Sequence, residues 1–219
     1  MSDTHAPHDP ATMFTERAWE ERYRATPAVW SGRPNPQLVA EAADLPVGRA
    51  LDVGCGEGAD AIWLAERGWP VTGVDFATAA LERAAGHAAA RGPEVAGRTT
   101  WVHADITGGW DPGDGVFDLV SAQFMQLPEE PRTMLFARLA RAVAPGGTLL
   151  IVGHHFDDEH AADHPHLADM GYTAEEIAWS LDAERWEIVV AETRSRLGRL
   201  PGGSGETTLR DVVLRARRG

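Results

Sequence analysis

Short apolar runs alternate with amphipathic stretches over most of the chain. Helical patterns lie between these runs at 59–67, 78–91 and 131–143. Gly68 and Gly92 are suited to end the first two helices, because glycine readily adopts the left-handed conformation common after a helix. The runs that predict strands are RALDVG, PVTGVD, TTWVHAD, VFDLVSAQF and GTLLIVGHH. This rhythm predicts a doubly wound α/β fold with helices on both faces of a mostly parallel sheet.

The two ends of the chain differ from this rhythm. TERAWEERYRA predicts a short helix, and Asn35 followed by Pro36 predicts the start of a second one. Near the other end, Thr173 and Glu176 have the spacing of a capping box and predict a further helix start. RWEIVVAET and TTLRDVVLRARR then predict two strands joined by a glycine-rich loop. The complete prediction is a seven-stranded sheet with an antiparallel last strand.

Composition and charge narrow the possible partners. The 219 residues are 43% hydrophobic and 24% charged, which is ordinary for one globular domain in water. A formal charge of −13 argues against nucleic acid as a partner, since phosphate binding needs a basic surface. The opening MSDTHAPHDPATMF lacks the basic start and apolar core of a signal peptide, so no membrane association is expected. Cys55 is the single cysteine, which is compatible with a reducing cytoplasm.

Three glycines occupy alternate positions after the first predicted strand, in LDVGCGEGAD. Gly54, Gly56 and Gly58 allow a tight strand-to-helix turn and the close approach of a ligand. Asp75, at the end of the second strand, is placed to accept hydrogen bonds from two ribose hydroxyls. Thr78 is the better cap for the following helix, which leaves Asp75 for a ligand. The pattern predicts a site for an adenosine-containing cofactor at the carboxyl ends of the strands.

Two adenosine cofactors compete for this turn, a nicotinamide dinucleotide and S-adenosylmethionine. Glycine spacing does not decide between them, because GCGEGA also fits the dinucleotide pattern. Asp52 and Glu57 place negative charge where a pyrophosphate would be repelled and a cationic sulfonium or ammonium tolerated. Asp105, after the third strand, supplies a carboxylate for an adenine amino group or caps a turn. These charges favour S-adenosylmethionine.

The segments LDVGCGEG, VTGVDFA, VHADIT, FDLVSAQFMQLP and LARAVAPGGTLLIVGHH follow one another in a familiar order. Over residues 49–153 the chain resembles the class I S-adenosylmethionine-dependent methyltransferases, which have a Rossmann-like fold. The resemblance implies that the methionine part of the cofactor contacts Asp52, Gly54, Gly56 and Gly58, with Cys55 packed between two of the glycines and Gln123 facing the methionine end. It also implies that Asp75 contacts the ribose and that the adenine contacts Phe76, Asp105 and Ile106.

The segments WEERY and WSGRPN resemble the leader of a bacterial small-molecule branch of this family, close to its thiopurine and tellurite-detoxifying types. That leader folds over the bound cofactor, so residues 14–48 are expected to form a helical cover behind a disordered tail at 1–13. The resemblance places Trp30 and Arg33 in the cover, with Arg33 as partner for the cofactor's carboxylate. Trp19 and Trp30 would form an aromatic wall that excludes water.

Histidines supply the candidates for acid–base chemistry. His154 and His155 end the fifth strand, where the methyl group is expected, and a histidine suits proton removal from an O or N acceptor. Strand alternation allows at most one of them to be the base, and a structural hydrogen bond is the alternative. The run GHHFDDEHAADHPHLAD has metal-ligand residue types but no helical pair of ligands, so a solvated loop without metal is expected.

The sequence thus predicts a cytoplasmic bacterial methyltransferase that moves a methyl group from S-adenosylmethionine to a small-molecule acceptor, leaving S-adenosylhomocysteine. Residues 49–219 would form the cofactor-binding domain, with 154–182 shaping the acceptor pocket. A monomer or homodimer is expected, without nucleic acid or membrane. The alternatives are an NAD-dependent oxidoreductase, a non-catalytic binding protein with this fold, and metal-dependent hydrolysis by the histidine-rich run. The acceptor atom, O, N or S, is left open.

Overall fold

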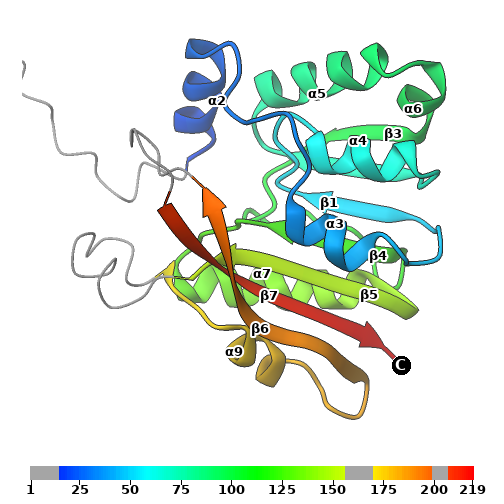
Figure 1. Ribbon diagram of the computed structural model, residues 1–219, viewed down its shortest axis with the longest axis vertical. Coiled ribbons are helices and arrows are strands. Elements are labelled where there is room, and N and C mark those ends of the chain that lie inside the picture. The colour runs from blue at the N-terminus through cyan, green and yellow to red at the C-terminus, as the bar shows by residue number, and fades with distance from the viewer. Residues whose placement is uncertain (1–14, 156–169, 199–206) are drawn as a thin grey trace, which may run out of the picture.

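The computed structural model describes residues 15–155, 170–198 and 207–219, and these form one seven-stranded sheet with helices on both faces (Figure 1). The strands are β1 (Ala50–Val53), β2 (Val71–Asp75), β3 (Thr99–His103), β4 (Phe117–Gln123), β5 (Val143–His154), β6 (Trp186–Gly198) and β7 (Thr207–Arg218). The helices are α2 (Glu16–Ala25), α3 (Pro36–Ala42), α4 (Ala59–Glu66), α5 (Thr78–Ala90), α6 (Pro93–Arg98), α7 (Glu129–Ala142) and α9 (Ala174–Ser180).

The strands are ordered β3-β2-β1-β4-β5-β7-β6 across the sheet. Neighbours from β3 to β5 are parallel, whereas β7 is antiparallel to both β5 and β6. The predicted fold class and antiparallel last strand are therefore confirmed. The strand order reverses between β1 and β4, and open α/β sheets bind ligands at such a switch point. The carboxyl ends of β1, β2, β4 and β5 meet at this edge, together with the amino end of β7.

Alternating side chains divide the core into two layers. Leu51 and Ile151 face the layer that includes α7 and α9, while Ala50 and Leu150 face the layer that includes α3 and α4. Because the central strands are buried on both faces, they read as nearly continuous apolar runs. Burial of each large apolar side chain stabilises the fold by about 1.5–3 kcal/mol. The sheet is thereby a firm base for the polar loops at its edge.

Local sequence signals set several boundaries as predicted. Asn35 caps α3 by accepting a hydrogen bond from the Gln37 amide at 2.9 Å. Thr173 and Glu176 form the expected capping box of α9. After α4 and α5 come two glycines with positive φ, at residues 68 and 92. These signals are local, so they could be identified without knowledge of the tertiary structure.

The start of α5 and two other boundaries differ from the prediction. Ala77, not Thr78, is the N-cap of α5, and the Ala79 amide donates to the Glu20 carboxylate of α2 at 2.9 Å. The capping role assigned to Thr78 is therefore wrong, because a carboxylate from the leader reaches the helix end. The short helix α6 was not predicted, and α7 begins at Glu129, before Pro131.

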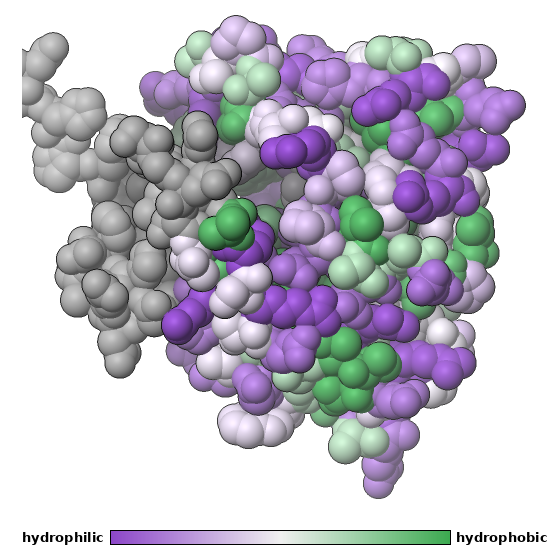
Figure 2. Space-filling model, in the orientation of Figure 1, coloured by the Kyte–Doolittle hydropathy of each residue, from purple (hydrophilic) through white to green (hydrophobic). Residues whose placement is uncertain are grey.

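The surface in Figure 2 is mostly hydrophilic, with hydrophobic residues in small separate groups, as is usual for a protein in water. No helix in the ranges described above is both long and apolar enough to cross a bilayer. The expected tail at 1–13, the histidine-rich run through 156–169 and the glycine-rich loop at 199–206 lie outside the described residues.

Candidate active site

The glycine turn connects β1 to α4 at the switch point. Gly54, Gly56 and Gly58 have φ angles of +68°, +52° and +81°, in the left-handed region where a Cβ atom causes strain. Space is short as well. A Cβ on Gly56 would lie 2.9 Å from the Tyr23 hydroxyl oxygen, and one on Gly58 would lie 2.7 Å from the Trp101 ring. The turn thus requires glycine for both conformation and packing, as its spacing predicted.

Asp75 ends β2 beside this turn. Its Oδ2 accepts a hydrogen bond from the Gly56 amide and its Oδ1 accepts one from the Ala77 amide, each at 2.9 Å. Burial raises the pKa of Asp75, and the amide donors oppose that shift. The carboxylate therefore ties the glycine turn to the start of α5. Each of its oxygens has a second lone pair, so hydrogen bonds from ribose hydroxyls remain compatible with this geometry.

Two carboxyl groups lie beneath the turn. Asp52 is 2% exposed, and its Oδ2 has no hydrogen-bond partner among the described residues. Asp60, in the first turn of α4, accepts a hydrogen bond from the Asn35 amide at 2.6 Å. Burial and the charge of Asp60 raise the pKa of Asp52, and burial raises the pKa of Asp60 to about 6. Two interacting carboxyls, of which Asp52 is buried and Asp60 partly buried, favour a positively charged ligand group.

Gln123 links the end of β4 to the leader. Its Oε1 accepts a hydrogen bond from Asn35 Nδ2 at 2.8 Å, and its Nε2 donates to the Ser121 hydroxyl at 2.8 Å. Asn35 is consequently joined to two parts of the edge, to α4 through Asp60 and to β4 through Gln123. The sequence indicated only the helix-capping role of Asn35, since these partners lie far along the chain.

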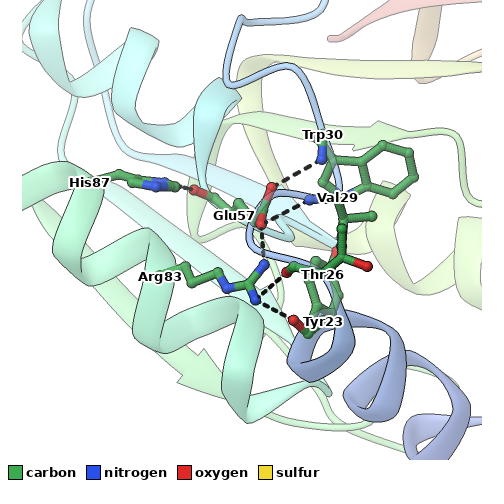
Figure 3. A network of polar contacts seen from close by, with 7 residues as sticks. All are labelled: Tyr23, Thr26, Val29, Trp30, Glu57, Arg83 and His87. Carbon is green, nitrogen blue, oxygen red and sulfur yellow. Dashed lines mark hydrogen bonds and ion pairs between the residues drawn. The ribbon is translucent and has the colours of Figure 1, made fainter.

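Glu57 of the glycine turn binds the leader. Its carboxylate accepts hydrogen bonds from the Val29 amide at 3.3 Å and the Trp30 amide at 3.1 Å (Figure 3). It also forms an ion pair with Arg83 of α5, at 2.7 Å between Oε1 and Nη1. Burial acts to raise the pKa of Glu57, but the bonds from Arg83, Trp30 and Val29 together lower it below its ordinary value.

Arg83 completes this link between the leader and the domain. Its guanidinium also donates to the backbone oxygens of Tyr23 and Thr26, where α2 ends, as Figure 3 shows. Our interpretation of Glu57 as a charge that repels a pyrophosphate is therefore wrong. The charge is balanced by Arg83, and the carboxylate faces the backbone of the leader.

An aromatic cluster in the leader lies beside Gly56. The Trp19 ring centroid is 5.9 Å from that of Tyr23 and 6.0 Å from that of Trp30, and Trp30 Nε1 donates to the Tyr23 hydroxyl at 2.9 Å. The two tryptophans thus lie together, as expected of an aromatic wall, although Trp30 is 49% exposed. The exposed Arg33 guanidinium forms no hydrogen bond or ion pair within the described residues, so it can bind an anionic group.

The residues expected at the adenine follow β2 and β3, which are neighbours in the sheet. Asp105 is exposed, and its Oδ1 accepts hydrogen bonds from the amide and hydroxyl of Thr107 at 2.8 and 2.7 Å. It therefore fills the alternative role, capping its own turn. Ile106 is buried in the core, and Phe76 packs half-buried against the cluster around Tyr23.

His154 and His155 have different surroundings where β5 ends. His154 stacks on Phe124 with ring centroids 4.3 Å apart, and burial lowers the pKa of its imidazole. The His155 backbone amide donates a hydrogen bond to the Arg210 carbonyl oxygen, while Nδ1 of its ring is buried without a hydrogen-bond partner among the described residues. Phe124 has φ +56°, an unusual value for a non-glycine residue and one associated with functional sites.

A sequence model of the methyltransferase domain matches residues 50–147 of this chain. The match begins at β1, includes the glycine turn and Asp75, and ends within β5. Residues 50–147 therefore form a methyltransferase domain, and the chain is similar to class I S-adenosylmethionine-dependent methyltransferases. The resemblance inferred from the five sequence segments is confirmed, and S-adenosylmethionine is the cofactor of the family. The narrower resemblance of the leader to one bacterial branch stays a prediction.

Individual methyltransferases are similar over part of their length. The chain is 36% identical over 135 residues to 2-heptyl-1-hydroxyquinolin-4(1H)-one methyltransferase of Mycobacteroides abscessus. The aligned residues make up 60% of this chain and 58% of that protein. It is 34% identical over 150 residues to trans-aconitate 2-methyltransferase of Rhizobium meliloti, 68% of this chain and 52% of that protein. The chain thus spans about half the length of these curated relatives.

A solved structure is similar over most of its length. It was determined for the conversion of a disulfide bond into a thioacetal group during echinomycin biosynthesis. It aligns with a TM-score of 0.72 and 26% identity, over 93% of this chain and 92% of that one. This likeness extends to the carboxyl-terminal strands, which lie beyond the matched methyltransferase domain.

Within this methyltransferase fold, several predicted cofactor residues gather at the switch point. Those in or beside the glycine turn are Trp30, Asp52, Gly54, Cys55, Gly56, Gly58, Asp75 and Gln123. Burial raises the pKa of the Cys55 thiol, which favours the packed role over a reactive one. Sequence reasoning missed Asp60 and Arg83 as site residues. The signal for Asp60 was its position in the first turn of the helix after the glycines, whereas Arg83 gave none.

Proposed function

We propose that this protein transfers the methyl group of S-adenosylmethionine to a small-molecule acceptor, leaving S-adenosylhomocysteine. The observation that carries the proposal is the glycine turn at the switch point, with the Asp75 carboxylate beside it. The match of residues 50–147 to the methyltransferase domain supports the cofactor. The names of the two similar proteins, which refer to a hydroxyquinolinone and to aconitate, support a small organic acceptor.

Charge complementarity supports specific roles at the methionine end. We assign Asp52 and Asp60 to the ammonium group, because two interacting carboxyls favour a nearby positive charge. Arg33 would pair with the carboxylate of the same amino acid. The backbone of Gly54, Cys55, Gly56 and Gly58 would line this part of the cofactor, with Gln123 facing it.

At the nucleoside end, Asp75 would accept hydrogen bonds from the ribose. Phe76 and Ile106 would contact the adenine. Asp105, which caps its own turn, would lie at the adenine edge only through lone pairs that the turn leaves free. The leader at 14–48 would act as the cover of the 49–219 domain, held by Glu57 and the aromatic cluster of Trp19 and Trp30. The sulfonium makes the methyl group reactive, so positioning and exclusion of water are the main tasks of these residues.

For proton removal we assign His154 rather than His155. Burial lowers the pKa of His154, so its ring is neutral near pH 7 and ready to accept a proton. Its stacking on Phe124 fixes the ring at the carboxyl end of β5. We place the acceptor here, beside the segment 154–182, and the base is needed for an O or N acceptor more than for a thiol.

We further propose that the protein is a bacterial cytoplasmic enzyme that works as a monomer or homodimer without nucleic acid. The charge of −13 supports the last point, since a phosphate backbone would be repelled. Size-exclusion chromatography with light scattering tests the oligomeric state. Association above a dimer would contradict this part of the proposal.

Calorimetric titration tests the proposed function. S-adenosylmethionine and S-adenosylhomocysteine are expected to bind with micromolar affinity, and NAD is not. In Asp75→Asn one oxygen that accepts an amide hydrogen is replaced by an NH₂ donor, so binding should weaken by about a hundredfold. Asp114→Asn, at an exposed turn on the opposite edge of the sheet, is the matched control and should bind normally. Binding of NAD alone, or of none of these compounds, would refute the proposal.

A further inference from the structure

His154 and Asp211 lie directly opposite each other in the antiparallel pair of β5 and β7. Residues in such register have side chains on the same face, with Cβ atoms about 4.5–5.5 Å apart. Val152 and Val213, two positions from each, pack in the layer that includes α3. The imidazole and the carboxylate therefore share the α3 side of the sheet. No role has been assigned to Asp211 in the function proposed above.

Asp211 is completely buried and firmly held. Its Oδ2 accepts hydrogen bonds from Arg196 Nε of β6 at 2.7 Å and from Gln37 Nε2 of α3 at 3.2 Å. Its Oδ1 is buried and accepts no hydrogen bond from the described residues. A buried carboxylate oxygen without a donor is unfavourable, and a positive charge nearby relieves that cost. Asp211 is thus poised for a further cationic or donor group.

Each element around His154 contributes to its charge environment. β7 supplies Asp211, and β6 supplies Arg196, whose guanidinium lies 5.7 Å from the Phe124 ring on which His154 stacks. α3 supplies the neutral Gln37. The charged groups one step farther, which pair with one another, are Glu41, Glu192, Arg194 and Arg215. Burial lowers the pKa of His154, while Asp211 acts to raise it and Arg196 to lower it.

We propose that Asp211 is a positioning residue for His154, and that Arg196 fixes its carboxylate where it balances the charge of a protonated imidazole. The proposal rests on the proposed function, in which His154 receives a proton from the acceptor. As His154 takes that proton, the acceptor's electron pair bonds to the methyl carbon and the carbon–sulfur pair leaves with sulfur. The new charge arises next to a carboxylate that Arg196 and Gln37 already hold in place.

NMR titration of the imidazoles in the ligand-free protein tests this proposal without an acceptor. His154→Gln identifies the His154 signal among the nine histidines. In Asp211→Asn the pKa of His154 should fall by about one unit, because the opposing negative charge is lost. In Arg196→Gln it should rise by about half a unit, because the positive charge is lost. Opposite signs are the diagnostic result.

Glu192→Gln is the matched control, since it removes an exposed charge from the same strand as Arg196. It should move the pKa of His154 by less than about 0.2 units. Arg196 lies on the edge strand with its side chain 26% exposed, so Arg196→Gln remains informative if Asp211→Asn does not fold. An unchanged or lowered pKa in Arg196→Gln would overturn the proposal, and so would an unchanged or raised pKa in folded Asp211→Asn.

Calorimetry on the same proteins separates this proposal from the function on which it rests. If the wild type does not bind S-adenosylhomocysteine, the proposed function fails whatever the titrations show. If it binds and the two variants leave the pKa of His154 unmoved, the role of Asp211 fails alone. Binding together with shifts of opposite sign supports both.

Discussion

The two ends of the proposed ligand-binding edge are built from different kinds of contact. At the β1–β2 end, the Asp75 carboxylate accepts hydrogen bonds from backbone amides of the glycine turn and of the start of α5. At the β5–β7 end, the polar groups are side chains from separate elements, among them Gln37 of α3 and Asp211 of β7, 174 positions apart. Side chains can be exchanged while the backbone is kept. In the proposed function, the end built on the backbone would bind the cofactor and the end built from side chains would bind the acceptor.

The leader connects the two ends. Glu57 and Arg83 hold its first part over the glycine turn, and Asn35 and Gln37 hold its second part to β4 and β7. In the proposed function, closure of the cofactor site and assembly of the acceptor end would therefore depend on the same segment. Mutations that change the properties of one end of this edge and leave the other end unchanged show how strongly the leader couples the two ends.

Of the three variants that test this comparison, Gly56→Ala should have the largest effect. A residue other than glycine at φ +52° loses about 1–2 kcal/mol, and the new Cβ would lie 2.9 Å from the Tyr23 hydroxyl. S-adenosylhomocysteine binding should weaken at least about tenfold, measured by calorimetry. Gly86→Ala, in α5 with no atom near the new Cβ, is the control and should raise the melting temperature. Equal affinity in the two variants would show that the turn does not contact the cofactor.

The next largest effect is expected for Glu57→Gln, which removes the charge of a nearly buried ion pair with Arg83. The leader should open more often, so the amides of Val29 and Trp30 should exchange hydrogen about tenfold faster. This corresponds to a decrease of about 1.4 kcal/mol in the free energy of local opening. Amides of β4 should keep their exchange rates. Glu94→Gln, whose side chain is 83% exposed, is the control. Unchanged hydrogen exchange at the leader amides would contradict the claim that Glu57 holds the leader to the domain.

The smallest effect concerns pH and Asp60→Asn. The pKa of Asp60 is about 6 in the folded protein against 3.8 ordinarily, so the folded state binds this proton more tightly. Its stabilising contribution is complete below pH 3.8 and disappears as the pH rises through 6. Between about pH 5 and about pH 7.5, the free energy of unfolding should fall by about 1 kcal/mol more in the wild type than in the variant.

Denaturant unfolding without cofactor measures this difference. Burial still raises the pKa of Asp52 in the variant, although the contribution of the Asp60 charge is lost, so the dependence on pH should become weaker without vanishing. Asp114→Asn should behave as the wild type does, because that carboxylate is exposed. Identical pH dependence in wild type and Asp60→Asn would show that Asp60 does not hold a proton in the folded state.

The success of the sequence predictions also differs between contacts made by nearby residues and contacts made by residues far apart in the chain. The sheet, the glycine turn and the position of Asp75 depend on signals within a few residues, and these predictions agree with the structure. Asn35 and Gln123 are 88 positions apart, and no local pattern indicates that they meet. The left-handed Phe124 could not be predicted either, because its residue type disfavours that conformation.

Charge roles were the least predictable. The sequence presents Glu57 as an unpaired carboxylate, and only the fold brings Arg83 against it. Asp105 was assigned to the adenine, yet its nearest donor is Thr107, two residues away. An acidic residue in a sequence shows that a charge is present. Its use depends on the partner that the tertiary structure supplies.

Hydrogen exchange with and without S-adenosylhomocysteine tests the central claim most directly, because it reports where the compound binds. With the compound bound, we predict slower exchange at the amides of Gly54, Gly56 and Ala77. The leader amides of Val29 and Trp30 should also exchange more slowly, while exchange in the far strand β6 should not change. That result would locate the cofactor between the glycine turn and its cover. Binding accompanied by protection elsewhere, with the glycine turn unchanged, would contradict the account.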